Sequence, residues 1–411
     1  MQNIEFNGLL AVAAVAFLVP FLLGFLPRLR VPASVLEVVV GIALGPAGLA
    51  WVKADGPVMV FGLLGLAFLL FFAGLEIDFE HLRGRPLLLT LLGFVVSLGL
   101  AFAVASGLGA LGWLRSPWLV AIILAATALG VIVPVLKDTG RISSLFGQTV
   151  IAGATIADLG TVVLLSLFFS RESKSIGVQI LLVVLLVLLA VIALAFIVRA
   201  ARVGRVKRIL AFAEDTTDQL RVRGAFLLLI AFVAVAERLG LEVILGAFVG
   251  GVVFAVLDRG RGRGVMQVNL QSKLEAVGYG VFVPAFFVTS GLRFDLQALL
   301  ASPGALVQIP VFLLALLVAR GLPALLYRPL LSTREVIAAG FLQATSLSFI
   351  VIGAQLGIEL KLLEPATGAA LVAAGMVSLL LFPLFALLIL GGKEAQSKSA
   401  LGTVLEASDA R

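Results

Sequence analysis

The sequence predicts an all-α polytopic membrane protein, and its composition, segment lengths and charge placement each indicate this class. Of the 411 residues, 61% are hydrophobic and only 13% are charged, and the mean hydropathy is +1.19. Soluble globular domains contain more charged and fewer apolar residues. The apolar residues form stretches of about 20 residues, the length at which a helix crosses the bilayer core. We therefore expect a bundle of transmembrane helices.

Charged and Pro/Gly-rich segments divide the chain into about thirteen such stretches. A helix of about 20 residues crosses the bilayer core. We expect transmembrane helices over residues 8–26, 34–50, 57–75, 86–112, 117–136, 147–169, 177–198, 221–238, 242–257, 277–292, 304–327, 334–356 and 364–391.

The basic residues indicate the orientation of these helices. With the N-terminus outside, the cytoplasmic connections hold 22 of the 30 Lys and Arg residues, the outer connections hold seven, and Arg320 lies within a span. Cytoplasmic loops are enriched in basic residues. We therefore expect a multi-pass membrane protein with the N-terminus outside and the C-terminal tail, residues 392–411, in the cytoplasm. The first thirty residues lack the basic start of a secretory signal, so the first span should be retained.

Composition also excludes several classes of function. One His and no Cys leave no disulfide, no thiolate site and no His cluster for zinc or a Ser/His hydrolase. No dinucleotide fingerprint is present, so no cofactor is expected. The net charge of +7 comes mainly from inner loops such as Arg199–Arg208 and Asp258–Gly264, which should face anionic membrane lipid. We predict neither an enzyme nor a nucleic-acid-binding protein.

The chain contains an internal repeat. FFAGLEIDFE at Phe71–Glu80 and FFVTSGLRFDLQ at Phe286–Gln297 share an FF pair and a GLxxD string. The preceding spans also echo each other, with GIALGP at Gly41–Pro46 and ILGAFVGG at Ile244–Gly251. The matching spans lie seven apart in the order of the chain. Because seven is odd, the two halves should have opposite orientations, as in the inverted repeats of many secondary transporters.

Asp158 is the first candidate for a functional residue. It lies halfway along the apolar stretch Gln148–Phe169. A carboxylate at the centre of a membrane helix costs roughly 2.5–3.5 kcal/mol, so such a residue is usually retained for work on an ion, a proton or a substrate. Asp158 therefore predicts transport of a small cation or a proton.

Two spans that correspond in the repeat carry polar residues or helix-breaking residues near mid-depth, and Pro134 among them frees a backbone carbonyl. Transporters with inverted repeats bind their substrate at the midplane, where interrupted helices expose backbone groups to a cavity. We expect two crossed broken helices here, whose hydroxyls and free carbonyls form an oxygen cage with Asp158. The residues are Thr127, Gly130 and Pro134 in span 117–136, and Gln343, Thr345, Ser346 and Ser348 in span 334–356.

Six strings that cover nearly the whole chain in order resemble the monovalent cation:proton antiporter superfamily. The similarity is to the branch of Kef-type potassium/proton and Nap-type sodium/proton exchangers. The strings are specific as a set. They are VPASVLEVVVGIALGP (Val31–Pro46), LLGLAFLLFFAGLEID (Leu63–Asp78), GATIADLGTVVLL (Gly153–Leu165), AERLGLEVILGAFVGG (Ala236–Gly251), FVPAFFVTSGLRFDL (Phe282–Leu296) and LLVARGLP (Leu316–Pro323).

The resemblance implies a homodimer that works by elevator-like alternating access. The antiporter domain would cover residues 1–391. The resemblance also implies how this domain is divided. Its interface part would comprise residues 1–85 and 221–292, its mobile core residues 86–169 and 304–391, and its linker helix residues 177–198.

Three residues match functional positions of the superfamily. Asp158 matches the essential ion-binding aspartate, Thr127 matches a threonine of the unwound span, and Arg320 takes the place of a basic residue. Two positions depart from the pattern. Ala157 stands where an acid or amide usually precedes the aspartate, and Ser346 stands where many relatives carry an acid. With Asp158 as the one titratable group placed at the midplane, we expect electroneutral one-for-one exchange. The Kef-type nucleotide-binding domain is not expected.

Each candidate residue also has a simpler interpretation. Asp158 could be a structural acid. Arg320 could neutralise the C-terminal end of a broken half-helix or extend to the headgroups. Thr127 and Ser346 could bond to the carbonyl one turn back. Glu37 and Glu76 could line an access funnel or lie at the interface.

We predict a secondary antiporter that exchanges Na⁺ or K⁺ for H⁺ across the plasma membrane of a prokaryote, with both ions competing for Asp158. A cation channel and a transport-inactive sensor or scaffold on the same fold are the alternatives. A channel would not need competition at one carboxylate. A sensor is suggested by Ala157 and Ser346, and it would produce no flux in liposomes.

Overall fold

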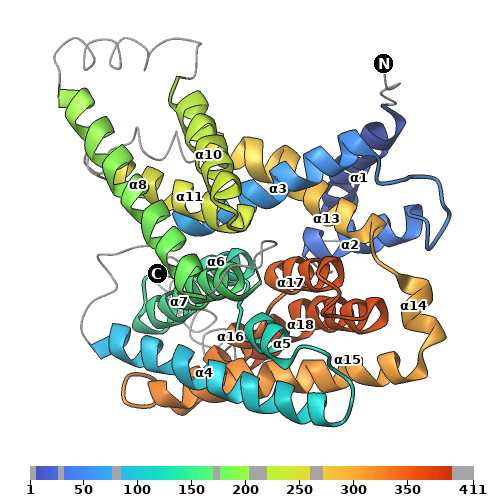
Figure 1. Ribbon diagram of the computed structural model, residues 1–411. Coiled ribbons are helices and arrows are strands. Elements are labelled where there is room, and N and C mark those ends of the chain that lie inside the picture. Colours follow the sequence, from blue (N-terminus) through green and yellow to red (C-terminus); the bar gives the residue numbers. More distant parts are fainter. Residues whose placement is uncertain are drawn as a thin grey trace, which may run out of the picture. The chain divides into compact units, whose positions relative to one another are not determined.

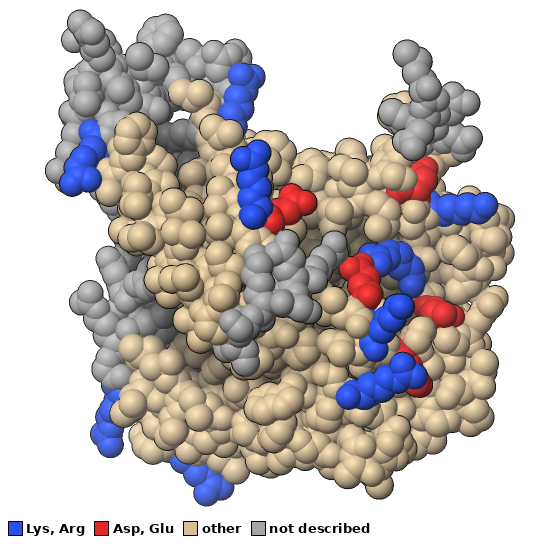
Figure 2. Space-filling model, viewed as in Figure 1, with Lys and Arg blue, Asp and Glu red and all other residues tan. Residues whose placement is uncertain are grey.

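The computed structural model describes residues 6–25, 32–75, 85–169, 176–202, 220–259 and 272–390, and the regular elements in these ranges are helices (Figure 1). Within them, nine helices are long and apolar enough to cross a membrane, and three shorter helices are also apolar. Charged side chains are sparse among the described residues on the face in Figure 2. The all-α, multi-span class is confirmed, whereas the count of thirteen spans stays a prediction.

The chain forms two compact units. Unit 1 contains Met1–Asp78, Asp158–Ala305 and Gln355–Ala369, and unit 2 contains Phe79–Ala157, Leu306–Ala354 and Ala370–Arg411. The helices of unit 1 are α1 (Asn7–Gly24), α2 (Ala33–Leu44), α3 (Gly56–Leu75), α8 (Ile176–Arg202), α10 (Leu220–Leu239), α11 (Val243–Arg259), the π turn η1 (Gly278–Phe282), α13 (Val283–Leu292) and α14 (Leu296–Ala301).

Unit 2 holds most of the remaining helices. Four helices cross the division between the units, and two of them divide near their middle or later: α7 after Ala157 and α17 after Ala354. The first residues of α15 and α18 also fall in unit 1. The helices are α4 (Arg85–Ala110), α5 (Pro117–Leu124), α6 (Leu129–Asp138), α7 (Leu145–Phe168), α15 (Pro303–Leu316), the π turn η2 (Leu317–Gly321), the 3₁₀ helix η3 (Leu322–Tyr327), α16 (Thr333–Ala344), α17 (Ser348–Glu359) and α18 (Pro365–Leu390).

Glycine contacts in unit 1 match the internal repeat. Helix α3 packs on α11, and α2 packs on α13. A Cβ on Gly74 would overlap the Phe248 carbonyl, and one on Gly251 would overlap the Phe71 carbonyl. In the second pair, a Cβ on Gly291 would overlap the Val38 carbonyl, and one on Gly41 would overlap the Val288 carbonyl. In the repeat α3 corresponds to α13 and α11 corresponds to α2. The α3–α11 contact therefore corresponds to the α13–α2 contact, as an internal repeat predicts.

Both predicted helix interruptions are present in unit 2. The expected span 117–136 is divided into α5 and α6 by residues 125–128, and the expected span 334–356 is divided into α16 and α17 by residues 345–347. The first break precedes Leu129, so Pro134 lies inside α6 rather than at the unwound centre. Pro134 therefore deprives the Gly130 carbonyl, in the first turn of α6, of its helical donor.

Two π turns lie directly before prolines. η1 ends two residues before Pro284, and η2 ends two residues before Pro323. Proline has no N–H group and its ring clashes with the carbonyl four residues earlier, so the regular hydrogen-bond ladder cannot continue through it. A π turn accommodates this local mismatch, and such turns are frequent at functional sites. The turn η2 contains Arg320.

Candidate functional site

The two helix breaks of unit 2 contact each other. The Thr127 hydroxyl donates a hydrogen bond to the Gln343 carbonyl, with an Oγ1–O distance of 2.9 Å. The Ala128 amide donates to the Thr345 carbonyl at 2.8 Å. Backbone groups that the interrupted helices cannot satisfy are therefore satisfied between the breaks. Thr127 bonds across the crossing and not to the carbonyl one turn back.

Arg320 is buried beside this crossing, with 1% of its surface exposed. Its Nε donates to the Thr127 hydroxyl at 2.9 Å, and its Nη2 donates to the Gly153 carbonyl of α7 at 3.3 Å. Thr127 in turn donates to Gln343, whose carbonyl lies in the last turn of α16. The C-terminal end of a helix carries partial negative charge. Two hydrogen bonds, with the Thr127 hydroxyl between them, thus connect the guanidinium to a half-helix C-terminus.

Ser346 lies in the second break and is fully buried. Its amide donates to Ser378 Oγ at 3.2 Å, and Ser378 Oγ donates to the Ser346 carbonyl at 3.0 Å. The Ser346 hydroxyl has no hydrogen-bond partner among the described residues. The neighbouring Thr345, by contrast, donates to the Phe341 carbonyl one turn back, at 3.1 Å. Ser346 Oγ is therefore an oxygen that the fold leaves available to a ligand.

Asp158 lies near the middle of α7 and is 4% exposed. Phe146, Val150 and Ala154 form a buried stripe on α7 with a spacing of four residues, and Asp158 is the next residue in that stripe. Thr161 follows one turn later, and its buried hydroxyl has no partner among the described residues. Residues three apart lie on neighbouring positions of a helix face. α7 therefore presents a carboxylate with a hydroxyl beside it.

Gln343 of the predicted polar cluster lies at the crossing together with two residues that sequence reasoning did not select, Tyr327 and Gly153. The side-chain amide of Gln343 donates to the Tyr327 hydroxyl at 3.0 Å, and both residues are 1% exposed. Both groups lie against Gly153 of α7. Gln343 was visible in the polar cluster of its span, but no local pattern points to Tyr327 or Gly153.

Of the two acids predicted to line an access funnel, Glu37 and Glu76, the structure describes only Glu37. Glu37 lies in the second turn of α2 and is 4% exposed, so it is buried within unit 1. Glu76 lies outside the described residues. The position of Glu37 fits either role, access funnel or interface, so an access funnel lined by these two acids stays a prediction.

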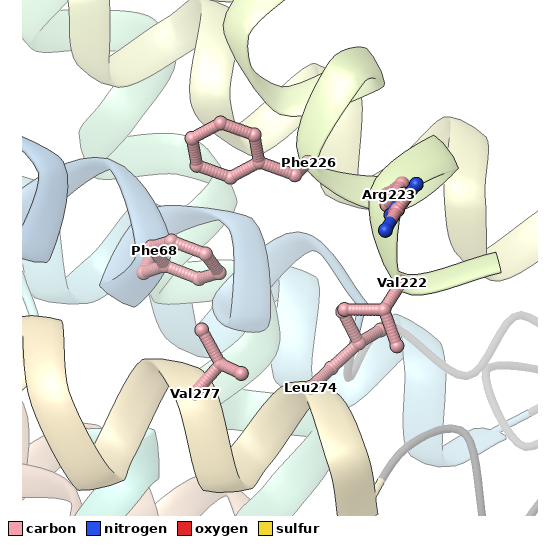
Figure 3. A pocket seen from close by; sticks show the side chains of 6 residues that line it. All are labelled: Phe68, Val222, Arg223, Phe226, Leu274 and Val277. Atoms are coloured by element: carbon pink, nitrogen blue, oxygen red, sulfur yellow. The ribbon is translucent and has the colours of Figure 1, made fainter. Parts of the chain in front are cut away.

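A separate cavity in unit 1 differs in character from the crossing. It has a volume of about 250 Å³ and opens between α3, α10 and the helix that begins at Ser272. In Figure 3 the rings of Phe68 and Phe226 lie on one side, and Val222 and Arg223 lie on the other. Aliphatic and aromatic walls beside a guanidinium do not suit a cation. The full lining is Phe68, Val222, Arg223, Phe226, Leu274 and Val277.

Comparison with known proteins gives matches over most of the chain. The chain is 31% identical over 399 residues to "Putative Na(+)/H(+) antiporter YjbQ" of Bacillus subtilis, covering 93% of this chain and 63% of that protein. It is 26% identical over 383 residues to "Probable Na(+)/H(+) antiporter 3" of Methanocaldococcus jannaschii, covering 91% and 93%. It is 23% identical over 384 residues to "Na(+)/H(+)-K(+) antiporter GerN" of Bacillus cereus, covering 91% and 94%. The chain thus spans less than two thirds of the length of the Bacillus subtilis relative.

The fold also matches a solved structure. The sodium proton antiporter MjNhaP1 from Methanocaldococcus jannaschii superimposes with a TM-score of 0.64 at 18% identity, covering 92% of this chain and 95% of that one. At this identity the match concerns the fold alone. Residues 13–387 match the family described as "Sodium/hydrogen exchanger, transmembrane". Since this match covers most of the chain and agrees with the crossed helix breaks, the chain belongs to the sodium/hydrogen exchanger family.

Proposed function

We propose that this chain is a secondary antiporter that exchanges Na⁺ or K⁺ for H⁺ by alternating access. The observation that carries the proposal is the contact between two broken helices, with Arg320 buried beside it, in a chain whose family is one of exchangers. This arrangement supports transport because interrupted helices provide oxygen ligands at membrane depth where a continuous helix provides none.

Asp158 is the proposed binding residue for both the cation and the proton. A carboxylate holds one proton or one monovalent cation, so the two compete. We add Thr161 to the predicted ligands Thr127 and Ser346, because its buried hydroxyl follows Asp158 by one turn and lacks a partner among the described residues. Hydroxyl and carbonyl oxygens are hard ligands and suit an alkali cation.

Arg320 is proposed to compensate the C-terminal end of a broken half-helix. Its 1% exposure argues against extension to the headgroups. A cation at a partly buried helix C-terminus contributes up to about 2 kcal/mol. The Arg320–Thr127–Gln343 chain of hydrogen bonds brings this charge to the last turn of α16.

The transport cycle is proposed to move residues 86–169 and 304–391 relative to residues 1–85 and 221–292, with 177–198 as the linker. The second set would form the contact of a homodimer. The membrane is proposed to be a prokaryotic plasma membrane, with the N-terminus outside, the C-terminus in the cytoplasm and the basic loops against anionic lipid. Glu37 and Glu76 are proposed to line the inner access path.

Selectivity between Na⁺ and K⁺ depends on the size of the binding cavity and on the free energy of removing water from each ion. Relatives are named both for Na⁺ alone and for Na⁺ together with K⁺, so both cations belong in the proposal. Reconstituted vesicles with an internal pH dye, exposed to Na⁺, K⁺ and Li⁺ in turn, would identify the substrate. Proton movement driven by a cation gradient is the expected result. Uncoupled cation flux would indicate a channel instead.

Asp158→Asn tests the site. The amide keeps the shape of the side chain and removes the titratable charge, so this variant should fold and exchange nothing. Asp295→Asn is the matched control, because Asp295 caps α14 through its side chain and Asn caps helices equally well. Exchange by Asp158→Asn comparable to the parent would refute the site assignment.

A further inference from the structure

Gln343 connects three elements of unit 2 at one point. Its backbone carbonyl accepts from Thr127 in the break after α5, and its side-chain amide donates to Tyr327 at the end of η3. The residue occupies the last turn of α16, directly before the second break, and is 1% exposed. Few positions in a helix can bond two other segments at once. The role of Gln343 therefore extends beyond α16.

The third element is α7, which approaches Gln343 at Gly153. A Cβ on Gly153 would overlap the Gln343 side-chain nitrogen and would come within 2.9 Å of the Tyr327 hydroxyl. The carbonyl of the same glycine accepts from Arg320 at 3.3 Å. The absence of a side chain at Gly153 thus allows α7 to lie directly on the Gln343–Tyr327 pair.

The distance from Gly153 to Asp158 is short. The two residues lie five positions apart on one continuous helix, which corresponds to a rise of about 7.5 Å. A hydrogen-bonded helix moves as a unit over such a length. Any change in how closely α7 approaches Gln343 therefore displaces Asp158 by a similar amount.

We propose that Gln343 is a positioning residue for ion binding, which fixes Asp158 by holding α7 at Gly153 through its contact there and with Tyr327. This inference rests on the proposed function of Asp158. Gln343 touches neither the cation nor the proton in this proposal. Its effect is on affinity, because a displaced carboxylate no longer matches the other oxygen ligands.

The test is a double-mutant cycle with Gly153→Ala and Gln343→Ala. The methyl of Gly153→Ala meets the Gln343 amide and the Tyr327 hydroxyl in the parent, and truncating Gln343 removes the nearer of these two contacts. Gly153→Ala should therefore raise the apparent KM for the cation about tenfold in the parent background and clearly less in the Gln343→Ala background. A tenfold change is about 1.4 kcal/mol, a coupling energy usual for residues in contact. Maximum rates should change much less than the KM.

Gln308→Ala is the matched control. Gln308 is a buried glutamine of α15 in the same unit, with 7% exposure and a side-chain oxygen that has no partner among the described residues. It makes none of the contacts of Gln343 given above. Its truncation tests whether any buried glutamine affects transport, and we expect the KM and the pH profile to stay those of the parent.

Thermal stability in detergent separates the contact from the function. The cycle in melting temperature tests the Gly153–Gln343 contact even without transport, and additive melting shifts would refute that contact. Coupled melting shifts with an unchanged KM and pH profile would make Gln343 structural only and overturn the proposal. If Gly153→Ala does not fold, Gln343→Met, which keeps the length and loses the hydrogen bond, must raise the KM by itself. Failure of the proposed function would instead appear as unimpaired exchange by Asp158→Asn.

Discussion

Replacing Arg320 tests how much its buried guanidinium contributes to the stability of the crossing between the two helix breaks. Arg320→Ala removes two hydrogen bonds, to Thr127 and to Gly153, and each bond from a charged donor contributes about 1.5–3 kcal/mol. Removing a buried charge also relieves its desolvation cost, which offsets part of this loss. The net loss of stability should be about 3 kcal/mol, the lower end of the range for two hydrogen bonds from a charged donor.

The assay is the melting temperature in detergent together with cation/proton exchange in vesicles. The shift in melting temperature depends on how many residues unfold together. If about 200 residues unfold with unit 2, a loss of about 3 kcal/mol lowers the melting temperature by roughly 6 °C or more. Arg320→Lys keeps the charge but cannot reproduce two fixed donor directions, so its loss should be about half as large. Exchange should fall strongly in Arg320→Ala and partly in Arg320→Lys.

Arg328→Ala provides the control. Arg328 follows η3 and is exposed, so its removal costs little. If Arg320→Ala and Arg328→Ala leave the melting temperature and the flux equally close to those of the parent, Arg320 compensates nothing at the crossing. Arg320 would then not stabilise the C-terminal end of α16, although its side chain is buried.

Three further predictions concern transport and packing. The apparent affinity for the cation should weaken as pH falls, because protons and cations compete for Asp158. An affinity that stays constant over the whole pH range in which the protein exchanges ions would contradict competition. Exchange should be electroneutral, because one carboxylate takes up either one proton or one cation. Net charge movement would instead couple exchange to voltage by about 2.3 kcal/mol per 100 mV, and steady-state Na⁺ gradients would then shift with valinomycin-set potentials. Such a shift would require a second acid such as Glu37, and Glu37→Gln should remove it. Gly251→Ala should destabilise unit 1 by about 1–3 kcal/mol because its Cβ overlaps the Phe71 carbonyl, whereas Gly99→Ala, with open space around it, should be neutral or stabilising in melting experiments.

The sequence was sufficient for those features that depend on local properties. Apolar run length predicted the helices closely: expected spans 86–112 and 364–391 correspond to Arg85–Ala110 and Pro365–Leu390. The polar cluster of span 334–356 predicted its interruption, because a helix in the membrane tolerates such groups only where its backbone can leave the regular pattern. Thr127, Gly130 and Pro134 predicted the interruption of span 117–136, although Pro134 itself lies within α6. The placement of Asp158 at mid-helix also needed only the chain itself.

The partners at the crossing were decided by tertiary structure alone. Thr127 and Gln343 lie 216 positions apart, Arg320 and Thr127 lie 193 apart, and Arg320 and Gly153 lie 167 apart. No periodicity or propensity relates residues at such separations, so the sequence left Arg320 between two interpretations. Only the packing of α7 against the breaks determines that its guanidinium is buried, and that a glycine is needed where Gln343 and Tyr327 meet that helix.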